Sequence, residues 1–485
     1  MDGGHSVTSN KKKAMNGGKW ITLSTVISTV FQFVQIAILA RLLAPADFGV
    51  VSISNLIIGF FGVFANLGFS NSIIYKQESD RTVLSTLYWL NMLVGVVIFV
   101  VIQFSAPAIV SFYGEPKLER VLQFSSWYFL IVYLGQLYMF LLEKELRFKS
   151  VATVDIVGTI IGSVTTITLA YSGFEELSLI IGQLVSQTVK SALQIMLGWP
   201  LFKPAFRFAI GKIQEHLRFG IFNLGDGVLG FVQSNADNFF IGSILGVKML
   251  GYYTLAYQLA IFPIIRLNPI ILQVAYPILA KMQNDNEGLK RAYLKILDVL
   301  AFCNLPLLAG LFITAESVVP LIYGPNWGET THLIQIFVFV GLFSCLGHPL
   351  FTLAFTKGKP NLLFYLNLVT LLVKVPMVYV MGHAYGITGI AISFVLVTLF
   401  NLVLNFWLVH YLVGDFLSLF LKNFIQPVFF CVVMVAVIAL YKSVIGYEGI
   451  VHTIAQIALG GATYVGLTLA FKLSFTELKA LREVV

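Results

Sequence analysis

Residues 35–54 have the sequence QIAILARLLAPADFGVVSIS, and residues 237–256 have the sequence DNFFIGSILGVKMLGYYTLA. The two stretches align without gaps at an offset of 202, which sets Gly49 over Gly251. Similarity at a fixed offset is the signature of an internal repeat. The sequence therefore predicts a chain built from two related halves.

The composition restricts the class of protein. Of 485 residues, 58% are hydrophobic and only 11% are charged. Soluble domains carry about 25% charged residues, so there are too few charges here to cover soluble domains of this length. Disordered chains combine low hydrophobicity with high net charge, which excludes that class as well. The remaining class is a polytopic membrane protein.

Hydrophobic runs predict how often the chain crosses the membrane. A helix needs about 20 apolar residues to span the hydrocarbon core. By this measure the sequence predicts an all-α membrane protein with 14 transmembrane helices. The predicted spans are 18–42, 47–74, 82–106, 118–142, 149–171, 178–199, 216–245, 249–280, 291–314, 329–355, 360–382, 386–411, 418–441 and 449–471.

The repeat groups these spans into two lobes of six helices. A second echo, near an offset of 210, relates Tyr113-Gly114 to Tyr323-Gly324. Because six is even, both lobes start on the same side of the membrane, and we expect a pseudo-twofold axis along the membrane normal. The predicted segments are a cytoplasmic tail (1–17), an N-lobe (18–199), a cytoplasmic linker (200–215), a C-lobe (216–411), an appended helix pair (412–471) and a second cytoplasmic tail (472–485).

The basic residues predict the orientation, because cytoplasmic loops carry an excess of Lys and Arg. With the N-terminus inside, the inner segments hold 23 of the 31 basic residues and the outer segments hold five. Both termini are therefore expected in the cytoplasm. The net charge of +8 follows from the same bias, so no nucleic-acid partner is expected.

Polar residues recur on single faces of several predicted helices, at the spacing of four, seven and eleven that marks one side of a helix. In span 18–42 they are Ser24, Ser28, Gln32 and Gln35. In span 216–245 they are Asp226, Ser234 and Asp237, which together with Gly230 superimpose on the first set at the offset of 202. In span 178–199 they are Gln183, Gln187, Lys190 and Gln194. These stripes predict a hydrated chamber; for Ser, Thr and Asn the alternative is hydrogen bonding between helices.

Three basic residues, Lys190, Arg266 and Lys374, fall within predicted spans. A charge near the helix centre costs about 2.5–3.5 kcal/mol on the insertion scale, so these residues are candidates for binding an anionic group. The alternative is structural pairing with carboxylates of Asp155, Asp226, Asp237 or Asp298. Asp226 and Asp237 are also candidates for coupling transport to H⁺ or Na⁺.

No arrangement typical of an enzyme is visible. The connecting segments are short, and no glycine-rich phosphate-binding loop with its lysine is present. The three cysteines and seven histidines lack metal-ligand spacing. We therefore expect no catalytic residue, no metal and no cofactor, and we do not expect an enzyme.

Three segments resemble a known family. The run ARLLAPADFGVVSISNLI (40–57) resembles the segment joining the first two helices of polysaccharide-type (Wzx-like) flippases of the MOP superfamily. The run SNADNFFIGSILGVKMLGYYTLAY (234–257) resembles their seventh and eighth helices, and VVPLIYGPNWGE (318–329) the entry to their tenth. Those proteins export lipid-linked repeat units of O-antigen, colanic acid or teichuronic acid.

The resemblance implies a flippase. Such a protein would move an undecaprenyl-diphosphate-linked oligosaccharide across the bacterial inner membrane by alternating access, for synthesis of lipopolysaccharide or another surface polysaccharide. The implied partners are this cargo, membrane lipids, H⁺ or Na⁺, and a polysaccharide polymerase complex. Arg41 and Asp47 approximately match an arginine and an aspartate of the related lipid II flippase. That flippase's arginine cluster in the first helix is absent here, so lipid II itself is not the expected cargo.

The sequence thus yields two sets of candidate residues. The predicted substrate-binding residues are Arg266, Lys190, Lys374, Arg41, Gln32, Gln35, Gln187 and Asn268, the last set over Asn66 by the repeat. The predicted coupling residues are Asp226, Asp237 and Asp47. Two other functions stay open: a cation-coupled multidrug exporter of the same architecture, for which twelve helices are expected, and a non-transporting scaffold of an envelope-synthesis complex.

Overall fold

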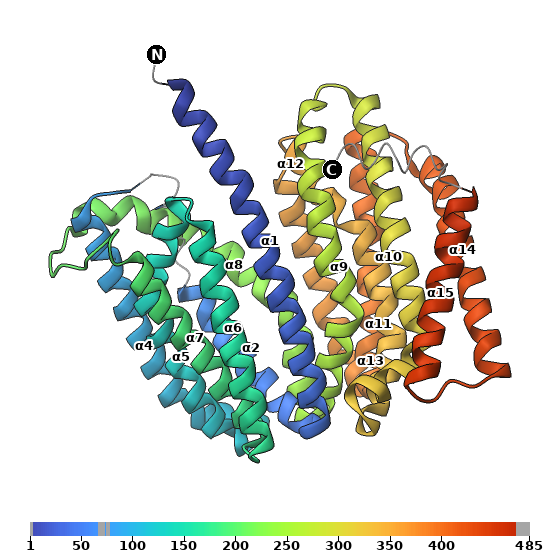
Figure 1. The fold of residues 1–485 in the computed structure, drawn as a ribbon, viewed down its shortest axis with the longest axis horizontal. Coiled ribbons are helices and arrows are strands. Elements are labelled where there is room, and N and C mark those ends of the chain that lie inside the picture. Colours follow the sequence, from blue (N-terminus) through green and yellow to red (C-terminus); the bar gives the residue numbers. More distant parts are fainter. Residues whose placement is uncertain (1–2, 66–72, 74–77, 472–485) are drawn as a thin grey trace. The chain divides into compact units, whose positions relative to one another are not determined.

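A computed structural model describes residues 3–65, 73 and 78–471. The chain divides into two compact units, residues 1–251 and 252–485 (Figure 1). The first unit contains α1 (Gly3–Leu42), α2 (Pro45–Ala65), α4 (Arg81–Tyr113), α5 (Lys117–Lys144), α6 (Phe148–Tyr171), α7 (Glu175–Gly198), α8 (Ile210–Leu245) and the start of α9 (Val247–Lys281). The second contains the rest of α9, α10 (Asn286–Tyr323), η1 (Pro325–Trp327), α11 (Gly328–Gly347), α12 (Pro349–Thr356), α13 (Asn361–Val413), α14 (Leu417–Val444) and α15 (Ile450–Phe471).

The described part of each predicted span is helical, and the span predicted at 329–355 covers both α11 and α12. Residues 66–72 and 74 of the span predicted at 47–74 lie outside the described residues. Eleven helices of the described chain are long and apolar enough to cross a membrane. One of them, α13, holds two predicted spans, because Gly386 interrupts it with φ 61° and ψ −143°. Helices α7 and α8 carry the spans predicted at 178–199 and 216–245. The prediction of an all-α, multi-pass membrane protein is confirmed, and the predicted lobe boundary at 200–215 stays a prediction.

Short polar residues and glycines set the ends of several helices. The Asp80 side chain accepts the Thr82 N–H at 2.8 Å and so caps α4. The same helix ends at Gly114, whose φ of 66° lets its N–H reach the carbonyl of Val110. A glycine is favoured there because residues with a Cβ rarely adopt this left-handed conformation. The turn residues of the sequence therefore fix where the membrane helices stop.

Small residues let α6 and α7 approach each other closely. A Cβ added to Gly162 would lie 2.5 Å from the Cβ of Ser186, and one added to Gly182 would overlap the Thr166 hydroxyl. Membrane helices associate through such small residues, because lipid supplies no hydrophobic force between them. The close contact places the polar face of α7 directly against that of α6.

The two stretches of the repeat meet in the first unit. A Cβ on Gly49 would overlap the backbone carbonyl of Val247, and a Cβ on Gly251 would overlap the carbonyl of Pro45. Pro45 and Val247 are themselves 202 residues apart, like Gly49 and Gly251. Such a reciprocal contact is what a twofold relation between two segments produces. The repeat in the sequence is therefore expressed as a symmetric backbone contact between the starts of α2 and α9.

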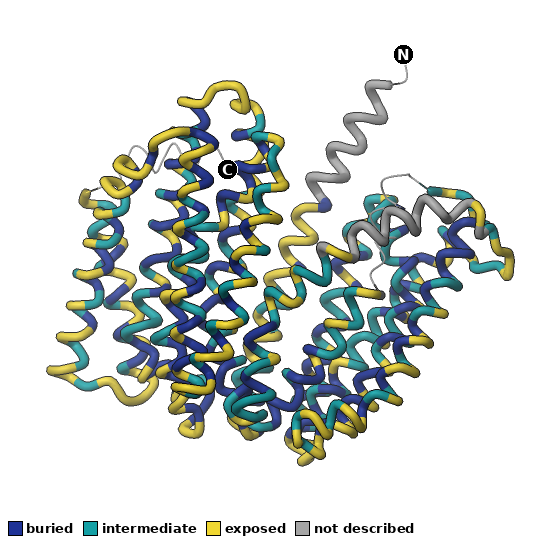
Figure 2. The backbone as a smooth tube through the Cα atoms, turned by 180° about the vertical axis from the view of Figure 1, so that it is seen from behind, coloured by how far each residue is buried: buried dark blue, intermediate teal, exposed yellow. Residues whose placement is uncertain are grey.

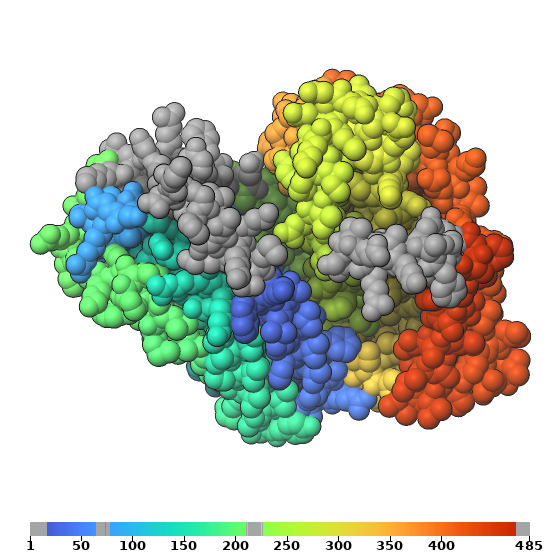
Figure 3. Space-filling view, turned by 45° about the horizontal axis from the view of Figure 1, so that its top comes forward, coloured from blue at the N-terminus to red at the C-terminus, as the bar shows by residue number. Residues whose placement is uncertain are grey.

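In the second unit, the hairpin of α14 and α15 packs on α10. The Ser317 hydroxyl donates to Gln456 Oε1 at 3.2 Å, and the Tyr464 hydroxyl donates to the carbonyl of Phe302 at 3.2 Å. The other faces of the hairpin are apolar and exposed (Figure 2), and both helices lie at one edge of the unit, shown in orange-red and red (Figure 3). Exposed apolar helix surface of this kind suits contact with lipid.

Candidate functional site

A polar cavity of about 420 Å³ lies within the first unit. Its volume falls in the range of about 300–1,000 Å³ that is usual for small-molecule sites. Helices α1, α2, α5, α6 and α7 supply the lining, and most of the lining side chains end in an amide or a hydroxyl. The lining residues are Gln32, Gln35, Val51, Asn55, Tyr128, Thr159, Gly162, Ser163, Thr166, Leu179, Gly182, Gln183, Ser186, Gln187 and Lys190.

Hydrogen bonds between helices orient the amides of this cavity. The Ser163 hydroxyl donates to Gln35 Oε1 at 2.7 Å, which fixes the α1 glutamine against α6. The Gln187 amide donates to the Ser191 hydroxyl at 3.2 Å, and Ser191 donates to the carbonyl of Ile131 at 2.8 Å. Because these bonds leave further donors and acceptors on each amide, the cavity wall can exchange hydrogen bonds with a bound molecule.

The structure brings four predicted substrate-binding residues together, since Gln32, Gln35, Gln187 and Lys190 all line this cavity. They come from two polar stripes that lie about 150 residues apart in the sequence. Their convergence fits the chamber that the stripes predict.

Sequence reasoning missed the contribution of α6. Thr159, Ser163 and Thr166 line the cavity and have the spacing of four and seven that places residues on one helix face. That spacing is visible in the sequence and is sufficient to predict a polar face on α6. Asn55 and Tyr128 also line the cavity, but neither belongs to a series of polar residues at the spacing of four, seven and eleven.

Lys190 pairs with Asp155 at the cavity. Its Nζ lies 3.2 Å from Asp155 Oδ1, and the side chains are 26% and 41% exposed. The aliphatic part of Lys190 lies against Gly158, where an added Cβ would overlap it. The pair therefore joins α6 to α7 and leaves both charged groups partly accessible.

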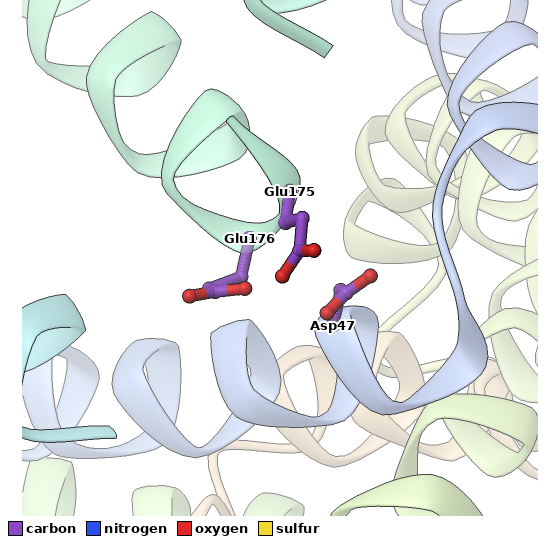
Figure 4. Close-up of side chains that lie close together, drawn as sticks. All are labelled: Asp47, Glu175 and Glu176. Atoms are coloured by element: carbon purple, nitrogen blue, oxygen red, sulfur yellow. The ribbon is translucent and has the colours of Figure 1, made fainter. Parts of the chain in front are cut away.

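A second lysine of the first unit is the centre of an acidic cluster. Lys117 Nζ lies 2.5 Å from Glu175, 3.1 Å from Glu176 and 3.3 Å from Asp47, and Figure 4 shows the three carboxylates converging. Asp47 is 5% exposed and also accepts the Ala44 N–H at 2.9 Å, at the start of α2. The lysine holds the pKa of the Glu175 carboxyl below its usual range, chiefly through their hydrogen bond.

The cluster therefore ties together the starts of α2, α5 and α7. Asp47 was predicted as a coupling residue. Its burial and its bonds to Lys117 and to the Ala44 N–H indicate a structural contribution, and its coupling role stays a prediction.

Replacing Lys117 by Met is expected to destabilise the protein by about 2 kcal/mol at pH 7. Removing one partner of a buried ion pair costs about 3–5 kcal/mol, and the value is lower here because the lysine side chain is 45% exposed and solvent screens it. Thermal unfolding in detergent measures the difference between the two proteins.

The destabilisation caused by Lys117→Met should be smaller at about pH 4 than at pH 7. A carboxyl whose pKa is lowered on folding contributes stability above its unfolded pKa, and this contribution disappears as the pH falls through the folded pKa. Lys248→Met, at an exposed lysine near the start of α9, is the control and should melt like the wild type. A Lys117→Met deficit that is the same at both pH values would contradict this account of the cluster.

The predicted substrate residue Asn268 lies in a buried network of the second unit. It is 1% exposed. Its Oδ1 accepts from Asn304 Nδ2 at 3.0 Å, and its amide nitrogen lies 3.1 Å from His348 Nδ1. Buried amides cost little when they are paired in this way. The network joins α9, α10 and the junction of α11 and α12, and the binding role of Asn268 stays a prediction.

The two mid-helix cations of the second unit differ in environment. Lys374 is 3% exposed, with its Nζ 4.4 Å from the ring centroid of Phe394. Arg266 is half-buried, and its guanidinium carbon lies 5.7 Å from the centroid of Phe262. In the part of the chain that the structure describes, no carboxylate oxygen lies within 4.0 Å of Arg266. Arg266 is thus the better placed of the two to meet an anion.

The remaining candidates lie elsewhere in the first unit. Asp237 is 2% exposed in α8. Arg41 is exposed in the last turn of α1, where a cation interacts favourably with the helix dipole. The side chain of Asp226 lies outside the described residues. The predicted roles of these three residues stay predictions.

Taken together, long apolar helices with a polar cavity inside one unit define a multi-pass membrane protein of the transporter class. The profile of the family described as "Polysaccharide biosynthesis protein" matches residues 38–332. The chain belongs to this family.

Two relatives support membership of this family. The chain is 30% identical over 397 residues to the lipopolysaccharide biosynthesis protein WzxC of Escherichia coli K12, covering 82% of this chain and 81% of that protein. It is 27% identical over 416 residues to the teichuronic acid biosynthesis protein TuaB of Bacillus subtilis, covering 86% of each. The resemblance to polysaccharide-type flippases is therefore confirmed.

Solved structures show the fold. The lipid II flippase MurJ in an inward closed conformation matches with a TM-score of 0.77 at 14% identity, covering 93% of this chain and 98% of that chain. An inward-facing multidrug resistance MATE transporter of the MOP superfamily matches with a TM-score of 0.61 at 16% identity, covering 81% and 96%. The chain thus has the fold of the MOP superfamily.

Proposed function

We propose that this protein is a flippase that moves an undecaprenyl-diphosphate-linked oligosaccharide across the bacterial inner membrane, for synthesis of a cell-surface polysaccharide. The polar cavity of the first unit carries the proposal, because its amides, hydroxyls and one tyrosine ring suit the hydroxyl groups and apolar faces of sugars. The relatives named for lipopolysaccharide and teichuronic acid biosynthesis support the same cargo class.

In this proposal the cargo is divided between several groups of residues. The neutral side chains of the cavity hold the sugars. Arg266 holds the diphosphate, since a guanidinium forms two parallel hydrogen bonds to phosphate oxygens. The exposed apolar faces of α14 and α15 remain in contact with lipid. Alternating access of the cavity to the two leaflets then carries the sugars across while the lipid tail stays in the membrane.

The proposed orientation places both termini in the cytoplasm. It rests on the distribution of Lys and Arg, with 23 of the 31 basic residues in the inner segments. Coupling to H⁺ or Na⁺, and contact with a polysaccharide polymerase complex, are further parts of the proposal. Asp237 and Asp226 are the proposed coupling residues.

Complementation tests the function directly. In a strain whose own polysaccharide flippase is deleted, a plasmid carrying this chain should restore surface polysaccharide when the repeat units are compatible. Without the plasmid, the lipid-linked repeat unit should accumulate in the inner membrane. The measurements are surface polysaccharide by immunoblot and lipid-linked oligosaccharide by mass spectrometry.

The same strains separate the alternatives. A multidrug exporter would raise resistance to cationic dyes and leave the lipid-linked intermediate accumulated. In this strain a non-transporting scaffold would leave surface polysaccharide absent, and replacing Arg266 or Lys190 by neutral residues would change nothing. Either result would overturn the flippase assignment.

A further inference from the structure

Lys190 is the one charged side chain among the described residues that line the cavity. Its ammonium group carries three N–H donors, and among the described residues it donates one hydrogen bond, to Asp155 at 3.2 Å. Two donors are therefore available to a molecule in the cavity.

Lys117, in the same unit, is a lysine whose three N–H donors all have carboxylate partners. Its Nζ donates to Asp47, Glu175 and Glu176, which uses all three donors. Lys190 has a single carboxylate partner, and that partner is itself 41% exposed. Released Asp155 therefore stays hydrated, and exchanging it for another anion carries a small desolvation cost.

The surroundings of Asp155 also favour its replacement. Glu143 lies close enough to Asp155 for the two carboxylates to repel each other. Gly158 leaves the space in which the Lys190 side chain lies, so the ammonium is held at the cavity by packing as well as by its one bond to Asp155. A lysine whose single carboxylate partner is partly exposed is suited to exchanging it for a ligand.

The chemistry of the cavity selects the kind of anion. Amides and hydroxyls surround the ammonium, and a single positive charge matches a single negative charge. A diphosphate carries more charge than one lysine balances, whereas the carboxylate of a sugar acid carries one charge beside several hydroxyl groups. The cavity therefore suits an acidic sugar better than the diphosphate, for which Arg266 in the second unit is available.

We propose that Lys190 binds the carboxylate of an acidic sugar residue in the cargo, in exchange for Asp155. The proposal rests on the proposed function and makes it more specific, because it assigns the cargo to oligosaccharides that contain a sugar acid. It also assigns the diphosphate to other residues than Lys190.

A matched pair of disaccharides tests this proposal. Cellobiouronic acid and cellobiose differ by one carboxylate, and isothermal titration calorimetry with the purified full-length protein in nanodiscs measures the Kd of each. The wild type should bind the acid about tenfold more tightly, as expected for one charge-assisted hydrogen bond. Lys190→Gln should bind the two sugars with equal affinity. Asp155→Asn should increase the preference for the acid, because the competing carboxylate is gone.

Controls distinguish failure of this proposal from failure of the proposed function. Lys295→Gln, at an exposed lysine of α10, should keep the wild-type preference, and melting temperatures check that each variant is folded. Equal binding of both sugars by the wild type, or a retained preference in Lys190→Gln, overturns the acidic-sugar proposal alone. Binding of neither sugar by the wild type overturns both that proposal and the sugar-binding function of the cavity.

Discussion

Replacing Arg266 by Ala is expected to reduce polysaccharide export about a hundredfold while leaving the amount of protein in the membrane unchanged. Arg266 lies in the middle of α9, between Pro263 and Pro269. A charge in this position costs about 2.5–3.5 kcal/mol on the insertion scale, and the described chain offers it no carboxylate within 4.0 Å. We therefore expect that this costly charge is present because it binds an anion.

The magnitude follows from the proposed contact with the diphosphate. Truncating one member of a desolvated, hydrogen-bonded charge pair costs about 2–5 kcal/mol, and about 2.8 kcal/mol corresponds to a factor of 100. Surface polysaccharide and accumulated lipid-linked intermediate measure the loss. Arg266→Lys keeps the charge but cannot form bidentate hydrogen bonds to a phosphate, so export by this variant should lie between that of the wild type and that of Arg266→Ala.

Arg291→Ala is the matched control for this experiment. Arg291 is exposed near the start of α10, in a segment predicted to lie in the cytoplasm, and its removal should leave export at the wild-type level. An immunoblot of the membrane fraction checks that all variants are present in equal amounts. Wild-type export by Arg266→Ala would show that the guanidinium does not hold the cargo.

Replacing Gly251 by Val is expected to remove most of the folded protein from the membrane. Its first added atom would overlap the backbone carbonyl of Pro45. A backbone carbonyl at the start of a helix cannot rotate away as a flexible side chain can, so the starts of α2 and α9 would have to separate. Overpacking typically costs about 1–3 kcal/mol, and we expect about 3 kcal/mol here because the obstacle is backbone.

The repeat predicts a second position with the same effect. Gly49→Val should be as harmful as Gly251→Val, since its added Cβ would overlap the carbonyl of Val247. Gly62→Val in α2 is the control, because a Cβ added there meets nothing within 4 Å. Membrane abundance and melting temperature in detergent are the measurements. Normal abundance of both Gly49→Val and Gly251→Val would mean that this close contact does not support the fold.

The sequence was sufficient to predict the membrane helices and part of the site. In lipid, every backbone polar group must be paired within the protein, so a long apolar segment has little choice but to form a helix. Helical periodicity then places Gln32 and Gln35 on one face of α1, and Gln187 and Lys190 on one face of α7, without knowledge of any partner. The structure brings these four residues to one cavity.

The tertiary structure alone decided which groups meet. Lys190 and Lys117 are both lysines beside carboxylates in membrane helices, yet one has a single partner and the other has three. Asn268 and Arg266 are two residues apart in α9, yet the first is buried in an amide network and the second has no carboxylate partner in the described chain. Periodicity fixes which face a residue shares, but pairing depends on how each helix is rotated and how closely it approaches its neighbours. Those quantities depend on contacts such as Gly49 with Val247, which form only when distant parts of the chain pack together.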